Sequence, residues 1–108
     1  MAVSANGNEL YIANEAGYVQ FWNLNTGAQS GANIELPAGA YGIALRPTTG
    51  MLYVTTFYAG GGQIHVIDPA LHAAINGVVA GGDTRHVVFA ANGVGFVPNG
   101  GGWVDFLK

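Results

Sequence analysis

Hydrophobic and polar residues alternate in short runs along most of the chain, a pattern that predicts β-strands with one buried face. One run occurs three times, as LYIAN at residues 10–14, LYVTT at 52–56 and GFVPN at 95–99. The copies start 42 and then 43 residues apart, which is the period of a propeller blade or a solenoid unit. The pattern therefore predicts a row of repeated β-units and disfavours a sandwich, whose strands lack such repetition.

The third copy defines the alignment best. Residues 95–108 align without a gap on residues 10–23, so that Phe96 matches Tyr11 and Phe106 matches Phe21. Between the first two copies the offset rises from 42 to 45, because the loop at 57–62 is three residues longer than its counterpart. Length variation confined to a Gly-rich loop is expected of a common strand framework with variable connections.

Each complete unit is expected to hold four short antiparallel strands, which is the composition of a propeller blade. The expected strands are 2–4, 9–13, 17–23 and 32–36, then 43–45, 51–57, 63–67 and 74–79, then 87–90, 94–97 and 103–107. Pro98 is tolerable at the exit of its strand, beside a loop. The prediction is an all-β partial propeller of about 2.5 blades, with blades at 1–41, 42–85 and, incomplete, 86–108.

The repeats resemble those of the YVTN family of β-propellers. The matching stretches are 3–14 with 19–27, 42–56 with 62–70, and 81–99. This resemblance implies a propeller, commonly of seven blades, in a secreted or cell-surface setting in bacteria and archaea. It implies no single activity, because one scaffold hosts many functions.

Composition narrows the classes of partner. Charged residues make up 8% of the chain and the net charge is −3, whereas nucleic-acid binding needs clustered Lys and Arg. No cysteine is present for a disulfide or a thiolate metal site, and no apolar run reaches the length of a membrane span. We therefore expect no nucleic-acid partner and no membrane span.

The length of the chain implies a partner of another kind. Closed propellers typically have four to eight blades, so 108 residues are too few to close one. Either the chain is a piece of a longer polypeptide that holds the remaining blades, which we favour, or further copies of the same chain complete a ring.

Candidate ligand-binding residues lie in the loops expected at the channel mouth. They are Tyr41, Asp83, Arg85 and His86. Asp83, Arg85 and His86 together suit a carboxylate or phosphate, or a metal bound by the imidazole, and Tyr41 suits stacking on a ligand. His86 matches the His of the family's Pro-His-Gly word, although Arg85 and Val87 replace its Pro and Gly. The alternative is structural: a His86 hydrogen bond to a neighbouring blade, a solvated pair of Asp83 with Arg85, and packing for Tyr41.

Other residues have simpler interpretations. The glycines at 60–62 lack phosphate-loop spacing and predict a flexible turn. His65 and His72 are expected at the surface, without metal-ligand spacing. Four aromatic residues are expected to pack between blades: Phe21, Trp22, Trp103 and Phe106.

No nucleophile motif and no pair of carboxylates is recognisable, so the sequence favours a non-catalytic role. We expect a secreted or cell-surface binding module that presents its loop face to a protein, a glycan or a small ligand. Two alternatives stay open. One is a part of a propeller enzyme, lactonase-like, lyase-like or a quinone- or haem-dependent oxidoreductase, and the other is a fragment that assembles into a ring.

Overall fold

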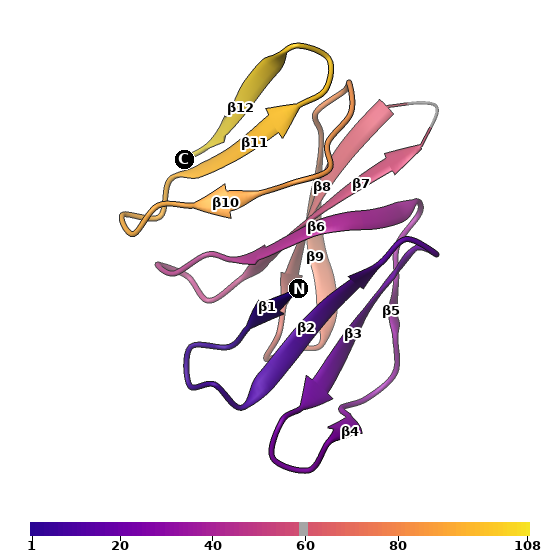
Figure 1. Ribbon diagram of the computed structural model, residues 1–108, viewed down its shortest axis with the longest axis vertical. Helices are drawn as coiled ribbons and strands as arrows, with labels where there is room; N and C mark the ends of the chain where they lie inside the picture. The colour runs from indigo at the N-terminus through magenta and orange to yellow at the C-terminus, as the bar shows by residue number, and fades with distance from the viewer. Residues whose placement is uncertain (59–60) are drawn as a thin grey trace.

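The computed structural model describes residues 1–58 and 61–108 and shows three antiparallel sheets stacked along the longest axis of the molecule (Figure 1). The first sheet contains β1 (Ala2–Val3), β2 (Glu9–Asn14), β3 (Tyr18–Asn23), β4 (Ala28–Gln29) and β5 (Ile34–Glu35). The second contains β6 (Gly39–Leu45), β7 (Leu52–Tyr58), β8 (Gly61–Asp68) and β9 (Ala73–Val79). The third contains β10 (Val88–Phe89), β11 (Gly95–Asn99) and β12 (Trp103–Leu107). The all-β prediction is confirmed, and neighbouring strands follow one another in the chain except that β5 pairs with β3.

The repeat alignment agrees with the strand register. Tyr11 lies opposite Phe21 in the first sheet, and Phe96 lies opposite Phe106 in the third. In the second sheet Tyr53 lies opposite Val66. The repeat offsets of 42 and 45 residues make Tyr53 the equivalent of Tyr11 and Val66 the equivalent of Phe21. Because a slip of one residue would turn every side chain to the other face, the three sheets share one arrangement of inward and outward positions.

The outer strand of the first sheet differs from the expected run at 32–36. Two short strands, β4 and β5, both pair with β3 and leave a gap between them. In that gap Gly31 has a φ of 77°, and the carbonyl of Ala32 contacts the ring of His72 in the second sheet. The backbone is thus drawn out of the ladder by a neighbouring sheet.

The innermost strand of the second sheet begins earlier than expected, at Gly39, so β6 runs through the boundary placed between residues 41 and 42. Ala40 pairs with Thr56 and Gly42 with Thr55, which leaves Tyr41 as an extra residue in a β-bulge. The Gly42 amide donates to Oγ1 of Thr55 at 2.9 Å. Bulges redirect side chains and are frequent beside functional sites.

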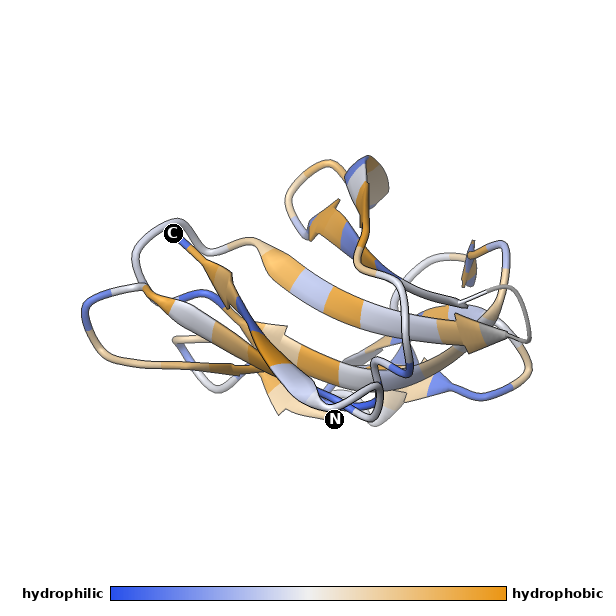
Figure 2. Cartoon of the chain, turned by 90° about the horizontal axis from the view of Figure 1, so that it is seen from above, coloured by the Kyte–Doolittle hydropathy of each residue, from blue (hydrophilic) through white to orange (hydrophobic). Residues whose placement is uncertain are grey.

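Two apolar layers hold the three sheets together, and bands of hydrophobic and polar residues alternate along the strands in Figure 2. Between the first and second sheets lie nine buried residues: Tyr11, Val19, Phe21, Ile34, Ala40, Ile43, Leu52, Val54 and Ile67. Between the second and third sheets lie Ile64, Val87 and Val97, flanked by Tyr53 and Phe89. Each sheet therefore packs face to face on the next, as blades do.

The four aromatic residues expected between blades have different outcomes. Phe21 is buried there, and Trp22 is half-buried on the opposite face of the first sheet. Trp103 and Phe106 are exposed, contrary to the expectation. Phe106 lies on the side of the third sheet that no described residue covers. No helix of the described residues has the length and apolarity needed to cross a membrane.

Candidate functional site

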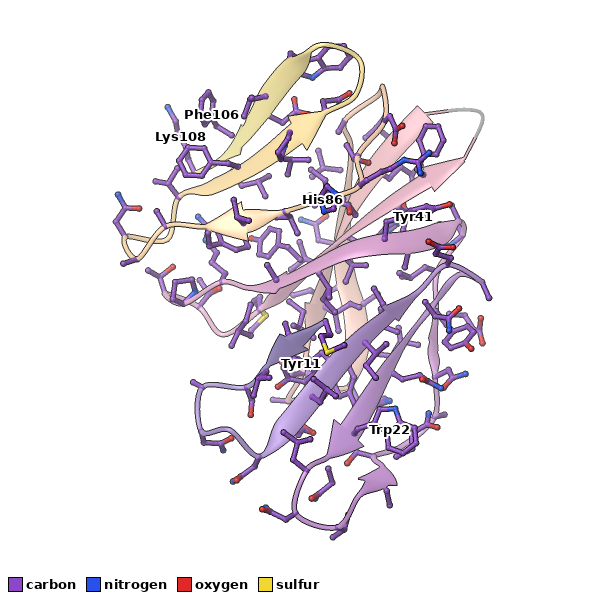
Figure 3. The ribbon with its side chains drawn as sticks, viewed as in Figure 1. Tyr11, Trp22, Tyr41, His86, Phe106 and Lys108 are labelled. Carbon is purple, nitrogen blue, oxygen red and sulfur yellow. The ribbon has the colours of Figure 1, made fainter. Side chains whose placement is uncertain are left out.

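The loops that connect sheets lie beside the loops between the two middle strands of each sheet. The Leu36 amide donates to the Gly17 carbonyl at 2.8 Å, and the Ala80 and Gly81 amides both donate to the Gly62 carbonyl at 3.0 Å. We call this end of the molecule the loop face; it comprises residues 15–17, 36–38, 80–87 and 100–102. Figure 3 labels Tyr41 and His86, which come from β6 and from the connection between β9 and β10.

Asn99 holds the connection 80–87 in place from the next sheet. Its Oδ1 accepts from the Asp83 amide at 3.0 Å and from the Gly101 amide at 2.8 Å, while its Nδ2 donates to the Gly81 carbonyl at 2.9 Å. Asn99 is buried, so this amide satisfies backbone groups that would otherwise lack partners. The position of Asp83, and with it the candidate site, therefore depends on Asn99.

Thr84 anchors the same connection to the second sheet. It is fully buried, and its Oγ1 donates to the Thr56 carbonyl at 2.9 Å. The side chain fills the space above Gly62, where a Cβ atom would collide with Thr84 Oγ1. Gly61 and Gly62 consequently begin strand β8 instead of forming the expected flexible turn, while residues 59 and 60 lie outside the described residues.

Arg85 occupies the centre of the candidate site. Its guanidinium carbon lies 5.0 Å from the ring centroid of Tyr41 and 5.1 Å from that of Phe57, within the range of cation–π attraction. Its Nε donates to Oδ1 of Asp83 at 2.7 Å in an ion pair. The Arg85 side chain is nonetheless 49% exposed. A positively charged group is thus held in a defined orientation at the surface.

Local backbone features explain why these residues meet. The β-bulge at Tyr41 removes this residue from the strand ladder, and its ring lies beside Arg85. At Gly42 a Cβ atom would lie 2.8 Å from the Arg85 carbonyl oxygen and 2.8 Å from the His86 Cα. Only glycine lets the connection cross β6 at this distance, so Gly42 is a requirement for the site.

The site holds more negative than positive charge, because Asp83 and Glu15 lie near the single guanidinium of Arg85. The hydrogen bond and the charge of Asp83 raise the pKa of Arg85 above its already high value, with smaller contributions from Tyr41 and Glu15. Arg85 therefore stays charged at all relevant pH values, and Asp83 and Glu15 offset that charge. Among the described residues, no side chain accepts a hydrogen bond from the two terminal nitrogens of Arg85.

The structure brings together three of the four predicted residues, Tyr41, Asp83 and Arg85. The fourth, His86, is exposed, and no hydrogen bond joins its ring to the described residues. Within those residues no group of three or more His, Asp or Glu side chains is arranged to hold a metal ion, and no enclosed pocket is present. A ligand role for these residues stays a prediction.

Two contributors to the site were not predicted from the sequence. Phe57 was assigned only to a strand, although an aromatic residue at the end of a strand before a Gly-rich loop is a usable signal. Asn99 was recognised only as the repeat equivalent of Asn14. The interpretation of the other histidines as surface residues was also wrong in part: His72 packs on Phe21 with ring centroids 4.5 Å apart, and His65 Nε2 is buried without a described partner.

No protein-family model matches the sequence, and no curated protein sequence matches it significantly. Solved structures do match the fold. Hydrazine synthase of Kuenenia stuttgartiensis is similar with a TM-score of 0.87 and 20% identity over 99% of this chain and 31% of that chain. The U3-55K protein is similar with a TM-score of 0.79 and 17% identity over 98% of this chain and 32% of that chain.

These two proteins are β-propeller proteins, which supports the propeller fold of this chain. The chain spans about a third of the length of each. At these identities the similarity concerns the fold alone.

Proposed function

We propose that this chain is a non-catalytic binding module, built from blades of the YVTN type, in a secreted or cell-surface protein. Its loop face presents Arg85 to a carboxylate group carried by a protein segment, a glycan or a small ligand. The repeat motifs support the assignment of blade type and setting. The observation that supports the binding role is the fixed, half-exposed guanidinium of Arg85 between Tyr41 and Phe57.

The chemistry of the guanidinium group determines the class of ligand. Asp83 occupies the Nε side of Arg85, which leaves the edge formed by the two terminal nitrogens facing outward from the pair. This edge matches the two oxygens of a carboxylate in a bidentate hydrogen bond. Because Asp83 and Glu15 offset the positive charge of Arg85, ligand recognition depends more on the orientation of the two terminal nitrogens than on the net charge of the site. Tyr41 adds a ring against which an apolar part of the ligand can pack.

The test is an NMR titration that follows the Nε–H resonances of the two arginines. We would add three probes separately: a hexaglutamate peptide, an oligosaccharide of glucuronic acid, and citrate. The proposal expects the Arg85 resonance to move in a saturable way with at least one of them. The Arg46 resonance serves as an internal control, because its Nε donates to the Gly93 carbonyl at 2.9 Å.

Two variants test whether binding requires the guanidinium group of Arg85. Arg85→Lys keeps the charge and removes the planar guanidinium, so it should weaken binding at least about tenfold if bidentate recognition operates. Because this variant lacks the Arg85 Nε–H resonance, its binding is measured by calorimetry and compared with that of the unmodified chain. Leu71→Gln alters an exposed turn residue between β8 and β9, away from the loop face, and should bind as the unmodified chain does. Equal shifts at Arg46 and Arg85, or unchanged binding by Arg85→Lys, would contradict the proposal.

A further inference from the structure

The outer side of the third sheet carries an uncovered apolar surface. Val88, Phe96, Val104 and Phe106 lie on this side, which we call the distal face. Val104 is 50% exposed and Phe106 59% exposed. The rings of Phe96 and Phe106 meet edge to face with centroids 5.4 Å apart. In Figure 3 Phe106 lies at the outer margin of the molecule, whereas Tyr11 lies in its interior.

The same aromatic pair occurs in the first sheet, and there it is covered. Tyr11 and Phe21 occupy the equivalent ladder positions, with ring centroids 4.9 Å apart and edge-to-face geometry. Tyr11 is 3% exposed and Phe21 is 1% exposed, because the second sheet packs on them. The first interface of the molecule therefore shows what kind of surface covers such a pair.

Three branched aliphatic side chains form the apolar part of that covering surface. Leu52 lies opposite Ile67 in the ladder, with Val54 two residues further along the strand, and all three are fully buried. None of these three carries a polar group, although His65 lies opposite Val54 on the same side of the sheet. Any partner of the distal face should present a comparable triplet.

The chain carries a similar triplet at its other end, in which an aromatic residue, Trp22, replaces one aliphatic residue and donates from Nε1 to Gln20 Oε1 at 3.5 Å. By the repeat offsets, Leu10, Ile12 and Trp22 of the first sheet match Leu52, Val54 and Ile67. Leu10 lies opposite Trp22 in the ladder, as Leu52 lies opposite Ile67. These three residues face away from the second sheet and are half-buried. We call this surface the proximal face.

We infer that a second copy of this chain covers the distal face with its proximal face. The contact would repeat, between molecules, the interface that joins the first and second sheets within one molecule. None of the seven residues on the two faces is charged, so no like-charge repulsion opposes the contact. This inference does not depend on ligand binding at Arg85.

The two faces are different surfaces, so the contact is heterologous and each molecule has one of each kind. Such contacts form a closed ring or an open chain. Two copies contribute six sheets, which lies within the four to eight blades of closed propellers, whereas three copies contribute nine. The expected assembly is therefore a dimer with two equivalent interfaces and a mass of twice 11.1 kDa.

The test is the solution mass, measured by light scattering after gel filtration at about 100 µM chain, with circular dichroism to confirm folding. Phe106→Glu places a charge on the distal face, and Ile12→Glu places one on the proximal face. Each variant alone should lose the dimer. Val104→Glu provides a second distal variant, so the test does not rest on one substitution. Leu71→Glu changes an exposed apolar turn residue outside both faces and should keep the dimer.

Mixing the two variants distinguishes this contact from a symmetric one. An equal mixture of Phe106→Glu and Ile12→Glu retains one unmodified distal face and one unmodified proximal face. The mixture should therefore form a heterodimer, weaker than the original because only one of its two interfaces is intact. A folded monomer for the unmodified chain, open-ended polymers, or a mixture that stays monomeric would overturn the inference.

Discussion

The His72 ring of the second sheet contacts the Ala32 backbone of the first, with Nε2 2.7 Å from the carbonyl oxygen. The same ring packs edge to face on Phe21, with centroids 4.5 Å apart. A turn at the far end from the loop face thus joins two neighbouring blades through one hydrogen bond and one aromatic contact. At this position His72 has a φ of 52°, a backbone conformation that few non-glycine residues adopt readily.

Replacing His72 should therefore weaken the packing of the first sheet on the second. His72→Asn tolerates the positive φ, so its effect reports the lost contacts and not backbone strain. We expect a loss of about 1–3 kcal/mol in the free energy of unfolding, from one hydrogen bond and one aromatic pair. Urea denaturation measures it, with His86→Asn as the exposed control. Equal stability of the two variants would show that the contact contributes nothing.

Asn99 and Asn14 occupy the same repeat position and differ in what they hold. Asn99 bonds to the connection between the second and third sheets, whereas Asn14 Oδ1 accepts only from the Ala16 amide, at 2.8 Å. Asn99→Ala leaves partly buried backbone groups of Gly81, Asp83 and Gly101 without these partners and should cost about 1–3 kcal/mol of unfolding free energy. Asn14→Ala, the matched control, should cost about 0.5–1 kcal/mol.

The same pair of variants connects stability to the candidate site. Because Asn99 positions the Asp83 amide, Asn99→Ala should also change the Arg85 Nε–H resonance, and Asn14→Ala should leave it in place. An unchanged Arg85 resonance in a folded Asn99→Ala protein would show that the Asn99 side chain is not needed to position the connection, which Thr84 and the Gly100 amide also hold.

The repeat predicted the strand framework well, because alternation with a period of two leaves one register in which Tyr11 and Phe21 face the same side. The longer loop expected at 57–62 was wrong in part, because the added residues lengthen the strands: β7 continues to Tyr58 and β8 begins at Gly61. The Tyr41 bulge was not predictable, because it depends on Gly42 allowing the connection at 85–86 to cross β6.

Contacts between sheets were equally inaccessible to sequence reasoning. The sequence predicts His72 only as a turn residue, because its contact partner Ala32 lies 40 positions away in the chain. The pairing of Asp83 with Arg85 was considered from their proximity in the chain, whereas the rings of Tyr41 and Phe57 reach Arg85 only through the folding of three separate segments. Local patterns thus predict the blades, and the site arises from how one blade is joined to the next.

The two arginines should separate stability from binding. Arg46 donates from Nε to the Gly93 carbonyl and from Nη1 to the Tyr53 hydroxyl, both at 2.9 Å, and so joins the second sheet to the third. Arg46→Met should lower the free energy of unfolding by about 1–2 kcal/mol, through lost hydrogen bonds. Arg85→Met should change it by less than about 0.5 kcal/mol, as exposed substitutions do. Equal losses in urea denaturation would show that Arg85 is structural.

His65 should make the stability of the fold depend on pH. Burial lowers the pKa of His65 below its usual 6.5, and its Nε2 has no described hydrogen-bond partner. The unfolded chain therefore takes up a proton at a higher pH than the folded chain does, so stability is greatest above about pH 6.5 and falls as the pH drops below it. Urea denaturation at pH 7.5, 6.0 and 5.0 should show this decline. His65→Gln should remove part of it, and His86→Gln, at an exposed site, should retain it. If His65→Gln declines as steeply as the unmodified chain, another group is responsible for the pH dependence.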